Sequence, residues 1–231
     1  MFLPRVTQFL LCAVPLFAMS LRASQPAVIV GFVGGFVHHD DAAHEEVQLA
    51  DRLRHEYPSG VVVKMFANHA GQAAHREILR VLDGNDDGDL SAAEKSTARV
   101  VLFGHSWGGA ETVATARRLE ADGIPVLLTV QVDSVSKPGT NDRLIPANVA
   151  RAVNFYQSDG ILHGKREILA ADPSRTRILG NFRSSYKRSS IDTRGYPWYA
   201  QLFMRPHIEI ESDPSVWGRI ETLVRAALSP K

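Results

Sequence analysis

The chain has 231 residues, of which 45% are hydrophobic and 22% charged, and its formal net charge is +1. This length and composition are those of an ordinary globular protein with the size of one α/β domain. Basic and acidic residues are mixed along the chain rather than gathered in blocks. We therefore expect neither a nucleic-acid partner nor a polybasic membrane patch.

Residues 1–23 have the layout of a secretory signal peptide: an arginine, a nearly uncharged apolar run, and small polar residues at its end. The run is shorter than the roughly 20 residues that a spanning helix needs. We expect cleavage after Ser20 or Ala23 and a secreted or periplasmic mature protein without a transmembrane segment; an uncleaved anchor is the alternative. The single cysteine, Cys12, lies in this segment, so residues 24–231, expected to form one domain, contain no thiol.

From residue 27 onward, apolar β-branched runs alternate with amphipathic patterns. Strands are expected at 27–33, 60–68, 98–104 and 124–133, and helices at 41–57, 73–82 and 108–123, with a short helix after an acidic loop. Beyond Ser134 the pattern weakens, and it predicts short strands at 151–157 and 176–182 and a closing helix at 213–228. This alternation predicts an α/β fold with a doubly wound, mainly parallel sheet.

The segment GHSWG, residues 104–108, fits the pattern G-x-S-x-G between a predicted strand and a predicted helix. This is the setting of a nucleophile elbow, in which the serine occupies a tight, strained turn. Glycines on both sides let the strand and the helix approach each other without a Cβ clash. We therefore expect Ser106 to be a nucleophile; a glycine-rich helix start that binds an anion is the alternative.

In this elbow and in the order of its elements, the chain resembles the α/β-hydrolase family, in particular its secreted lipase, esterase and thioesterase-like members. The resemblance covers nearly all of residues 24–231, and the elbow is its specific motif. It implies a triad in the chain order serine, acid, histidine. It also implies an oxyanion hole formed by the residue after the serine and by the loop after an early strand.

His207 best fits the triad histidine, because it follows the last predicted strands and precedes the closing helix, where we expect a loop; His163 is the alternative. Two aspartates compete for the acid. Asp133 ends the fourth strand, where open α/β sheets present functional groups. Asp159 follows the next strand, the position more usual in the family, but its sequence SDG is an ordinary turn signal. We prefer Asp133.

The loop after the first strand, VGGFVHHDD, is the predicted oxyanion loop. Its glycines can bring backbone N–H groups close to a substrate, and we expect Gly35 or Phe36 to donate together with Trp107. The sequence departs from the HGGG pattern of lipases, which leaves open which amide donates.

The same segment contains several metal-ligating residue types: His38, His39, Asp40, Asp41 and His44. Neighbouring side chains of an extended chain point apart, and no ligand pair at helical spacing resembles H-E-x-x-H. We expect no metal site in this segment.

The acidic segment DGNDDGDLSAAE, residues 83–94, matches an EF-hand loop along its whole length. The expected calcium ligands are Asp83, Asn85, Asp87, Asp89 through its carbonyl, Ser91 through water, and Glu94. Gly88 stands at the sharp bend. We expect a structural Ca²⁺ ion that stabilises the strand leading to Ser106; a solvated acidic turn is the alternative.

These features predict a secreted serine hydrolase that cleaves carboxylic esters or thioesters through an acyl-enzyme, with structural calcium and no organic cofactor. The expected substrate is a small-molecule or lipid acyl compound. Aromatic residues in 196–204 are expected in the core, with an acyl pocket near His207 as the alternative. Amide or carbon–carbon cleavage on the same fold, and a calcium-stabilised binding protein without activity, are the alternative functions.

Overall fold

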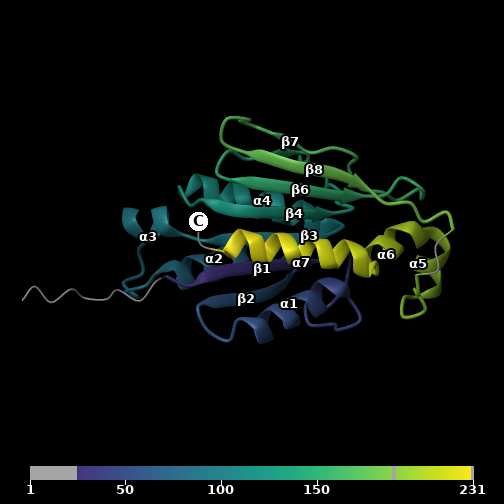
Figure 1. Ribbon diagram of the computed structural model, residues 1–231, viewed down its shortest axis with the longest axis horizontal. Coiled ribbons are helices and arrows are strands. Elements are labelled where there is room, and N and C mark those ends of the chain that lie inside the picture. The colour runs from purple at the N-terminus through teal and green to yellow at the C-terminus, as the bar shows by residue number, and fades with distance from the viewer. Residues whose placement is uncertain (1–24, 189–190, 230–231) are drawn as a thin grey trace, which may run out of the picture.

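The computed structural model describes residues 25–188 and 191–229, so the predicted signal peptide lies outside the described residues. The strands are β1 (Ala27–Val33), β2 (Val61–Ala67), β3 (Val100–His105), β4 (Val126–Val132), β5 (Leu144–Ile145), β6 (Arg151–Tyr156), β7 (Leu169–Ala170) and β8 (Arg177–Arg183). Six of them form one sheet in the order β2-β1-β3-β4-β6-β8, and each neighbouring pair is parallel (Figure 1). Strands β5 and β7 form a separate pair.

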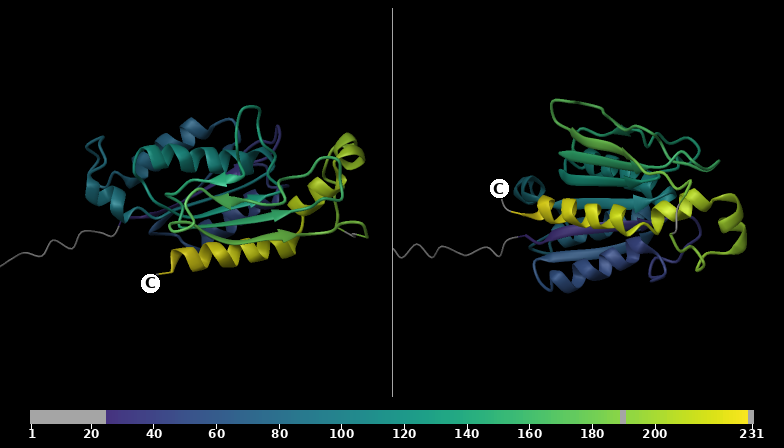
Figure 2. Two further views of the ribbon diagram at one scale, coloured as in Figure 1. Left: turned by 90° about the horizontal axis from the view of Figure 1, so that it is seen from above. Right: turned by 45° about the vertical axis from the view of Figure 1, so that its right-hand side comes forward.

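Helices cover both faces of this sheet. They are α1 (Glu45–Glu56), α2 (Gly71–Leu82), α3 (Ala92–Thr97), α4 (Trp107–Ala121), α5 (Trp198–Phe203), α6 (Arg205–Glu211) and α7 (Pro214–Leu228). Helices α1 and α7 pack on one face, and α2 and α4 pack on the other (Figures 1 and 2). The predicted α/β class with a doubly wound, parallel sheet is confirmed.

Strand β1 illustrates how the sequence produces the two layers. All seven of its residues are buried, as the uninterrupted apolar run predicts for a strand covered on both faces. Because successive side chains point to opposite faces, Ile29 belongs to the core under α1 and α7, whereas Val28 and Val30 belong to the core under α2 and α4.

The two ends of the sheet carry different structures. The strands point toward the end where α5 and α6 lie, and α3 with the acidic loop lies at the opposite end (Figures 1 and 2). In open α/β sheets, ligands bind outside the carboxyl ends of the strands. A functional site is therefore expected on the side of α5 and α6. Among the described residues, no helix has the length and apolar character to cross a bilayer.

Several predicted boundaries agree closely with the structure. Strand β1 has the predicted bounds, and α7 begins as expected, with Asp213 accepting a hydrogen bond from the Ser215 N–H at 2.9 Å and Pro214 at the first helical position. One expectation was wrong. His207 lies inside the short helix α6 rather than in a loop, because seven residues are too few for the sequence to show a helical period.

Candidate active site

Ser106 stands at the junction of β3 and α4 in a strained conformation, with φ of 55° and ψ of −123°. Residues other than glycine rarely adopt such values, which cost on the order of 1–3 kcal/mol. Neighbouring backbone holds the turn in place: the Ser106 N–H donates to the Val132 carbonyl at 2.9 Å, and the Ser106 carbonyl accepts from the Val135 N–H at 3.1 Å. The serine predicted from the sequence motif therefore occupies a tight turn at the carboxyl end of β3.

The glycines of the motif allow this turn to pack against β1. A Cβ atom on Gly108 would lie 2.2 Å from the carbonyl oxygen of Phe32, and one on Gly104 would lie 2.5 Å from the Gly108 carbonyl. Both contacts are with backbone, which cannot rotate away. The strand and the helix can therefore meet at Ser106 only because these two positions have no side chain.

Ser106, His207 and Asp133 form a hydrogen-bonded chain. The Nε2 atom of His207 lies 2.8 Å from the Oγ atom of Ser106, and its Nδ1 atom lies 2.7 Å from the Oδ2 atom of Asp133. All three residues are buried, with exposed fractions of 8%, 4% and 0% in that order. This arrangement can transfer the serine proton to an imidazole whose other nitrogen is held by a carboxylate.

Three further hydrogen bonds position the Asp133 carboxylate. Its Oδ1 atom accepts from the N–H groups of Gln157, at 3.2 Å, and Gly164, at 2.7 Å. Its Oδ2 atom accepts from the Gln157 side chain at 2.8 Å. Burial by itself raises the pKa of Asp133. Hydrogen bonds from His207, Gln157 and Gly164 stabilise the charged carboxylate, so the pKa lies below its usual value. Sequence reasoning missed Gln157 and Gly164, which carry no motif.

The alternative acid and the alternative histidine lie elsewhere. Asp159 accepts hydrogen bonds from the Ser185 hydroxyl and the Tyr186 N–H, each at 2.7 Å, and pairs with Arg183 at 3.3 Å. It therefore ties the β6–α5 region together rather than orienting His207. His163 is exposed, and its Nδ1 atom faces the carbonyl of the next residue at 3.0 Å.

The predicted oxyanion residues lie on two segments that meet at Ser106, since a Cβ atom on Gly34 would lie 3.1 Å from the Cβ atom of Ser106. Trp107 is the first residue of α4, so its N–H has no acceptor within the helix. The loop after β1 approaches from the other side: Gly35 has a φ of 47°, and its carbonyl accepts from the Asn68 side chain at 2.5 Å. The ring of Phe36 meets the ring of Trp107 edge to face, with 5.5 Å between their centroids. The two backbone segments expected to form an oxyanion hole are thus neighbours.

A second layer of buried polar side chains lies behind the triad. The ring of His105 is 4.6 Å from that of His207, and its Nδ1 atom is 3.3 Å from the Glu211 carboxylate. Burial lowers the pKa of His105 to about 4, so its imidazole is neutral, and burial raises the pKa of Glu46 well above its usual value. Sequence reasoning missed this layer, because Glu211 and its partner His44 are 167 residues apart.

Trp198, Tyr199 and Phe203 are exposed, so the expectation that the aromatic residues of 196–204 form core was wrong for these three, whereas Tyr196 is half-buried and packs against the His44 ring. Exposed fractions on α5 are 73% for Trp198, 52% for Tyr199, 66% for Leu202 and 64% for Phe203. Phe36, in the predicted oxyanion loop, is 98% exposed. An apolar surface therefore flanks the end of the molecule at which Ser106 and His207 lie.

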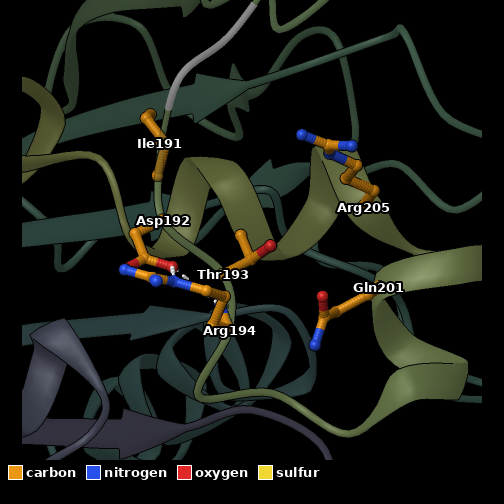
Figure 3. Close-up of a pocket in the computed structure, with 6 residues that line it drawn as sticks. All are labelled: Ile191, Asp192, Thr193, Arg194, Gln201 and Arg205. Atoms are coloured by element: carbon orange, nitrogen blue, oxygen red, sulfur yellow. Dashed lines mark hydrogen bonds and ion pairs between the residues drawn. The ribbon is translucent and has the colours of Figure 1, made fainter.

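A cavity of about 380 Å³ lies between α5, α6 and the segment that precedes them (Figure 3). Its lining residues are Ile191, Asp192, Thr193, Arg194, Gln201 and Arg205. Asp192 and Arg194 form an ion pair at 2.6 Å on its wall. No residue of the Ser106–His207–Asp133 chain lines this cavity, so it is separate from the candidate active site.

The acidic loop adopts a compact turn at the far end of β3. Gly88 has a φ of 86°, as its position at the bend requires. The Glu94 carboxylate closes the loop, accepting from the Gly84 N–H and the Ser91 N–H, each at 2.9 Å, while Ser91 caps α3. In the described part of the chain, clusters of three or more His or acidic side chains with ligand atoms within 4.8 Å of one another are found outside this loop.

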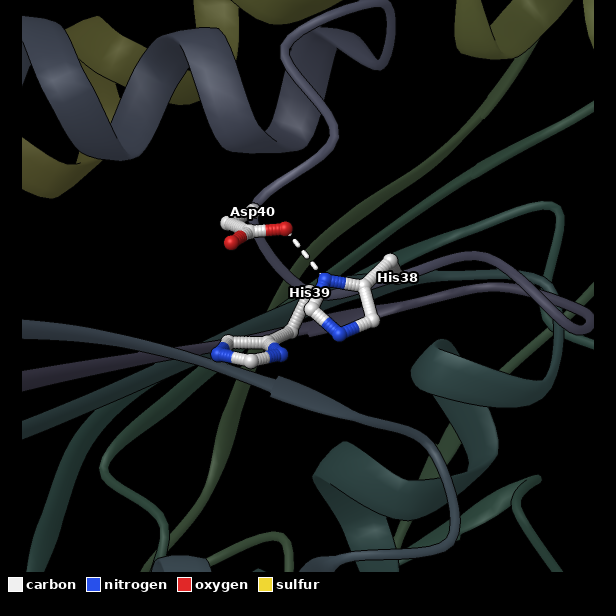
Figure 4. A group of neighbouring side chains, drawn as sticks. All are labelled: His38, His39 and Asp40. Carbon is white, nitrogen blue, oxygen red and sulfur yellow. Dashed lines mark hydrogen bonds and ion pairs between the residues drawn. The ribbon is translucent and has the colours of Figure 1, made fainter.

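Two such groups are present within the described chain: His38, His39 and Asp40, and His44, Glu46 and Glu211. The first is exposed in the loop after β1, where His38 bonds to Asp40 (Figure 4). Solvated side chains of this kind commonly occur without an ion. The second group is buried and belongs to the layer behind the triad.

Comparisons with known proteins give distant structural likenesses. No protein-family model and no curated protein matches the chain. Among solved structures, a dienelactone hydrolase-like promiscuous phosphotriesterase from metagenomic libraries is 16% identical, with 87% of this chain and 86% of that chain covered and a TM-score of 0.39.

Proposed function

We propose that this protein is a serine hydrolase that cleaves carboxylic esters or thioesters through an acyl-enzyme. The observation that carries the proposal is the buried chain from Ser106 Oγ to His207 Nε2, at 2.8 Å, and from His207 Nδ1 to Asp133 Oδ2, at 2.7 Å. A nucleophile hydrogen-bonded to a base, with the base oriented by a third group, is the arrangement that activates a hydroxyl at neutral pH.

In the first half of the reaction, Ser106 Oγ attacks the acyl carbon while His207 Nε2 accepts its proton. The imidazolium then gives that proton to the leaving alcohol or thiol as the bond from the acyl carbon to its oxygen or sulfur breaks. In the second half, His207 takes a proton from water, the hydroxide attacks the acyl-enzyme, and Ser106 is released with its proton restored. The Asp133 carboxylate stabilises the transient imidazolium.

The developing oxyanion needs donors that are already in place. The Trp107 N–H, at the start of α4, and the N–H of Gly35 or Phe36 are assigned this role, because these backbone segments flank Ser106. The exposed apolar side chains of α5 and Phe36 support an acyl substrate with apolar character, either a small molecule or a lipid.

We further propose that the mature protein is exported and holds a structural Ca²⁺ ion. Export rests on the sequence of residues 1–23. For calcium, the donor set of residues 83–94 is all oxygen, which suits this ion. Asp83, Asn85, Asp87 and Glu94 would hold it with their side chains, and the bend at Gly88 is consistent with the loop that such a site requires.

A fluorophosphonate probe tests the catalytic proposal directly. The oxygen of an activated serine attacks the phosphorus of such a probe and displaces fluoride, so the wild-type protein is expected to be phosphonylated and Ser106→Ala is not. A panel of acyl esters, thioesters and amides then identifies the bond that is cleaved. A folded wild-type protein that stays unlabelled would instead indicate a binding protein without activity.

A further inference from the structure

The buried group His44, Glu46 and Glu211 joins two segments far apart in the chain. His44 is the residue before α1, Glu46 lies in the first turn of α1, and Glu211 is the last residue of α6. Their ligand atoms lie within 4.8 Å of one another, and their exposed fractions are 7%, 0% and 3%. One imidazole and two carboxylates are thus directed to a common point from which solvent is excluded.

Two buried side chains at this point lack the hydrogen bonds that burial requires. Neither carboxyl oxygen of Glu46 makes a hydrogen bond of normal geometry, although the Gly34 backbone and the Glu211 carboxyl are its neighbours, and neither ring nitrogen of His105 has a hydrogen-bond partner among the described residues. The Nδ1 atom of His105 faces Glu211 at 3.3 Å. Burying a carboxylate without a partner is costly. The protein side chains alone therefore leave this site incomplete.

A divalent cation would complete it. On binding, the ion would displace the protons of Glu46 and His44, so that two carboxylates balance its double charge and the imidazole supplies a nitrogen lone pair. Within the described residues, Glu211 forms ion pairs with His44 and His105 and with no lysine or arginine. We propose that His44, Glu46 and Glu211 bind a divalent transition-metal ion, with His105 as the nearest further donor. This proposal revises, for His44, the expectation from sequence spacing, which does not include the distant Glu211.

The donor set identifies the class of ion. Imidazole and carboxylate together suit Zn²⁺, which is usually four-coordinate in structural sites, whereas Ca²⁺ and Mg²⁺ prefer oxygen ligands alone. The buried group therefore differs from the acidic loop 83–94 in the ion it selects. It also differs from the group of His38, His39 and Asp40, whose side chains are exposed to water.

The site would join the elements that form the candidate active site. His44 and Glu46 continue from the loop after β1, Glu211 ends the helix that carries His207, and His105 precedes Ser106. A bound ion would fix these three segments relative to one another. It acts at a distance from the reacting atoms, so its first effect is expected on the stability of the fold.

Metal content and binding test the proposal on untagged protein, since a histidine tag would itself bind zinc. After dialysis against buffer treated to remove metals, the protein is titrated with Zn²⁺ and the bound metal measured by elemental analysis. We expect one Zn²⁺ per chain and a thermal midpoint that rises with Zn²⁺ but not with Mg²⁺. Glu46→Gln should weaken binding by roughly 100-fold or more, because it removes a ligand.

Two matched variants serve as controls. Glu45→Gln removes the adjacent carboxylate of the same helical turn, and His39→Gln disables the exposed group; both should retain full Zn²⁺ binding. If Glu46→Gln does not fold, Co²⁺ added to the wild type provides a second measurement, through the visible absorption of a low-symmetry site. Less than stoichiometric Zn²⁺ with no Co²⁺ spectrum, or Zn²⁺ binding that His39→Gln abolishes, would overturn the proposal.

Discussion

The Nε2 atom of His207 lies 2.8 Å from the Oγ atom of Ser106, although 101 residues separate them in the chain. Helix α6 carries the histidine to the end of β3, where the strained turn presents the serine. The imidazole can act as a base only when the serine is there to give up its proton, and the serine is activated only when the imidazole accepts that proton. The two side chains are therefore expected to act as a unit.

The first prediction concerns this unit. Ser106→Ala and His207→Ala should each lower kcat by about 10⁴-fold or more, and the double variant should be no worse than either single variant, because the second change removes nothing that still functions. Hydrolysis of a chromogenic acetate ester measures all three. If the loss of kcat in the double variant equals the product of the losses in the two single variants, the two residues contribute separately.

The second prediction separates the two candidate acids. Asp133→Asn should lower kcat by about 10³–10⁴-fold with little change in KM, because an amide at this position favours the wrong imidazole tautomer and cannot stabilise its charged form. Asp159→Asn should stay within about twofold of the wild type, since Asp159 bonds to Ser185 and Tyr186. The opposite ranking of the two variants would reassign the acid.

The third prediction is the pH dependence of stability at Asp159. Hydrogen bonds from the Ser185 hydroxyl and the Tyr186 N–H lower the pKa of Asp159 in the folded protein. The unfolded value is about 3.9, so the carboxylate stabilises the fold above that pH, and this contribution is lost as the pH falls through the lower folded value. Urea unfolding should show Asp159→Asn less stable by roughly 1–2 kcal/mol at pH 7. A difference that grows toward pH 3 would contradict the assignment.

The fourth prediction compares two glycines. Gly108→Ala would place a Cβ atom 2.2 Å from the Phe32 carbonyl oxygen, so the backbone must shift. We expect a loss of about 1–3 kcal/mol in the free energy of unfolding together with most of the activity. Gly218→Ala, on the exposed side of α7 with no atom within 4 Å of the added Cβ, should instead gain roughly 0.5–1 kcal/mol. Chemical denaturation measures both, and equal effects would refute the steric account.

The fifth prediction concerns calcium. If the loop binds the ion, a Ca²⁺ concentration 100 times the Kd stabilises the fold by about 2.7 kcal/mol, and a chelator removes this gain. The double variant with Asp83→Asn and Asp87→Asn should lose the response, whereas kcat measured well below the unfolding temperature should change little. Thermal unfolding with Ca²⁺ and with chelator measures the effect. An identical midpoint under both conditions would leave the loop a solvated acidic turn.

The sequence predicted the sheet because its strands are long apolar runs whose burial does not depend on distant partners. Ser106 could be predicted because the steric demands of its turn are local and leave glycines at fixed spacing. His207 was chosen for its place in the chain order that the resemblance implies, and Asp133 for its place at the carboxyl end of the fourth strand; the structure places these two side chains 2.7 Å apart. Each of these features is encoded either within a short segment of the sequence or in the order of the helices and strands.

What could not be predicted depends on packing between distant segments. Gln157 and Gly164 meet Asp133 through loops whose paths leave no local pattern. His44 and Glu211 meet across 167 residues. The exposure of Trp198 and Phe203 reverses the usual burial of aromatic side chains and has no signature in spacing. Helices as short as α5 and α6 do not complete enough turns to show a period.

The two ends of strand β3 lead to different parts of the protein. Its amino end follows the acidic loop and α3, and its carboxyl end leads to Ser106. We expect substitutions at the amino end to change the stability of the fold, and substitutions at the carboxyl end to change the turn that presents Ser106. Substitutions in the acidic loop are therefore expected to change stability without changing reactivity, whereas substitutions in the tight turn at Ser106 change both.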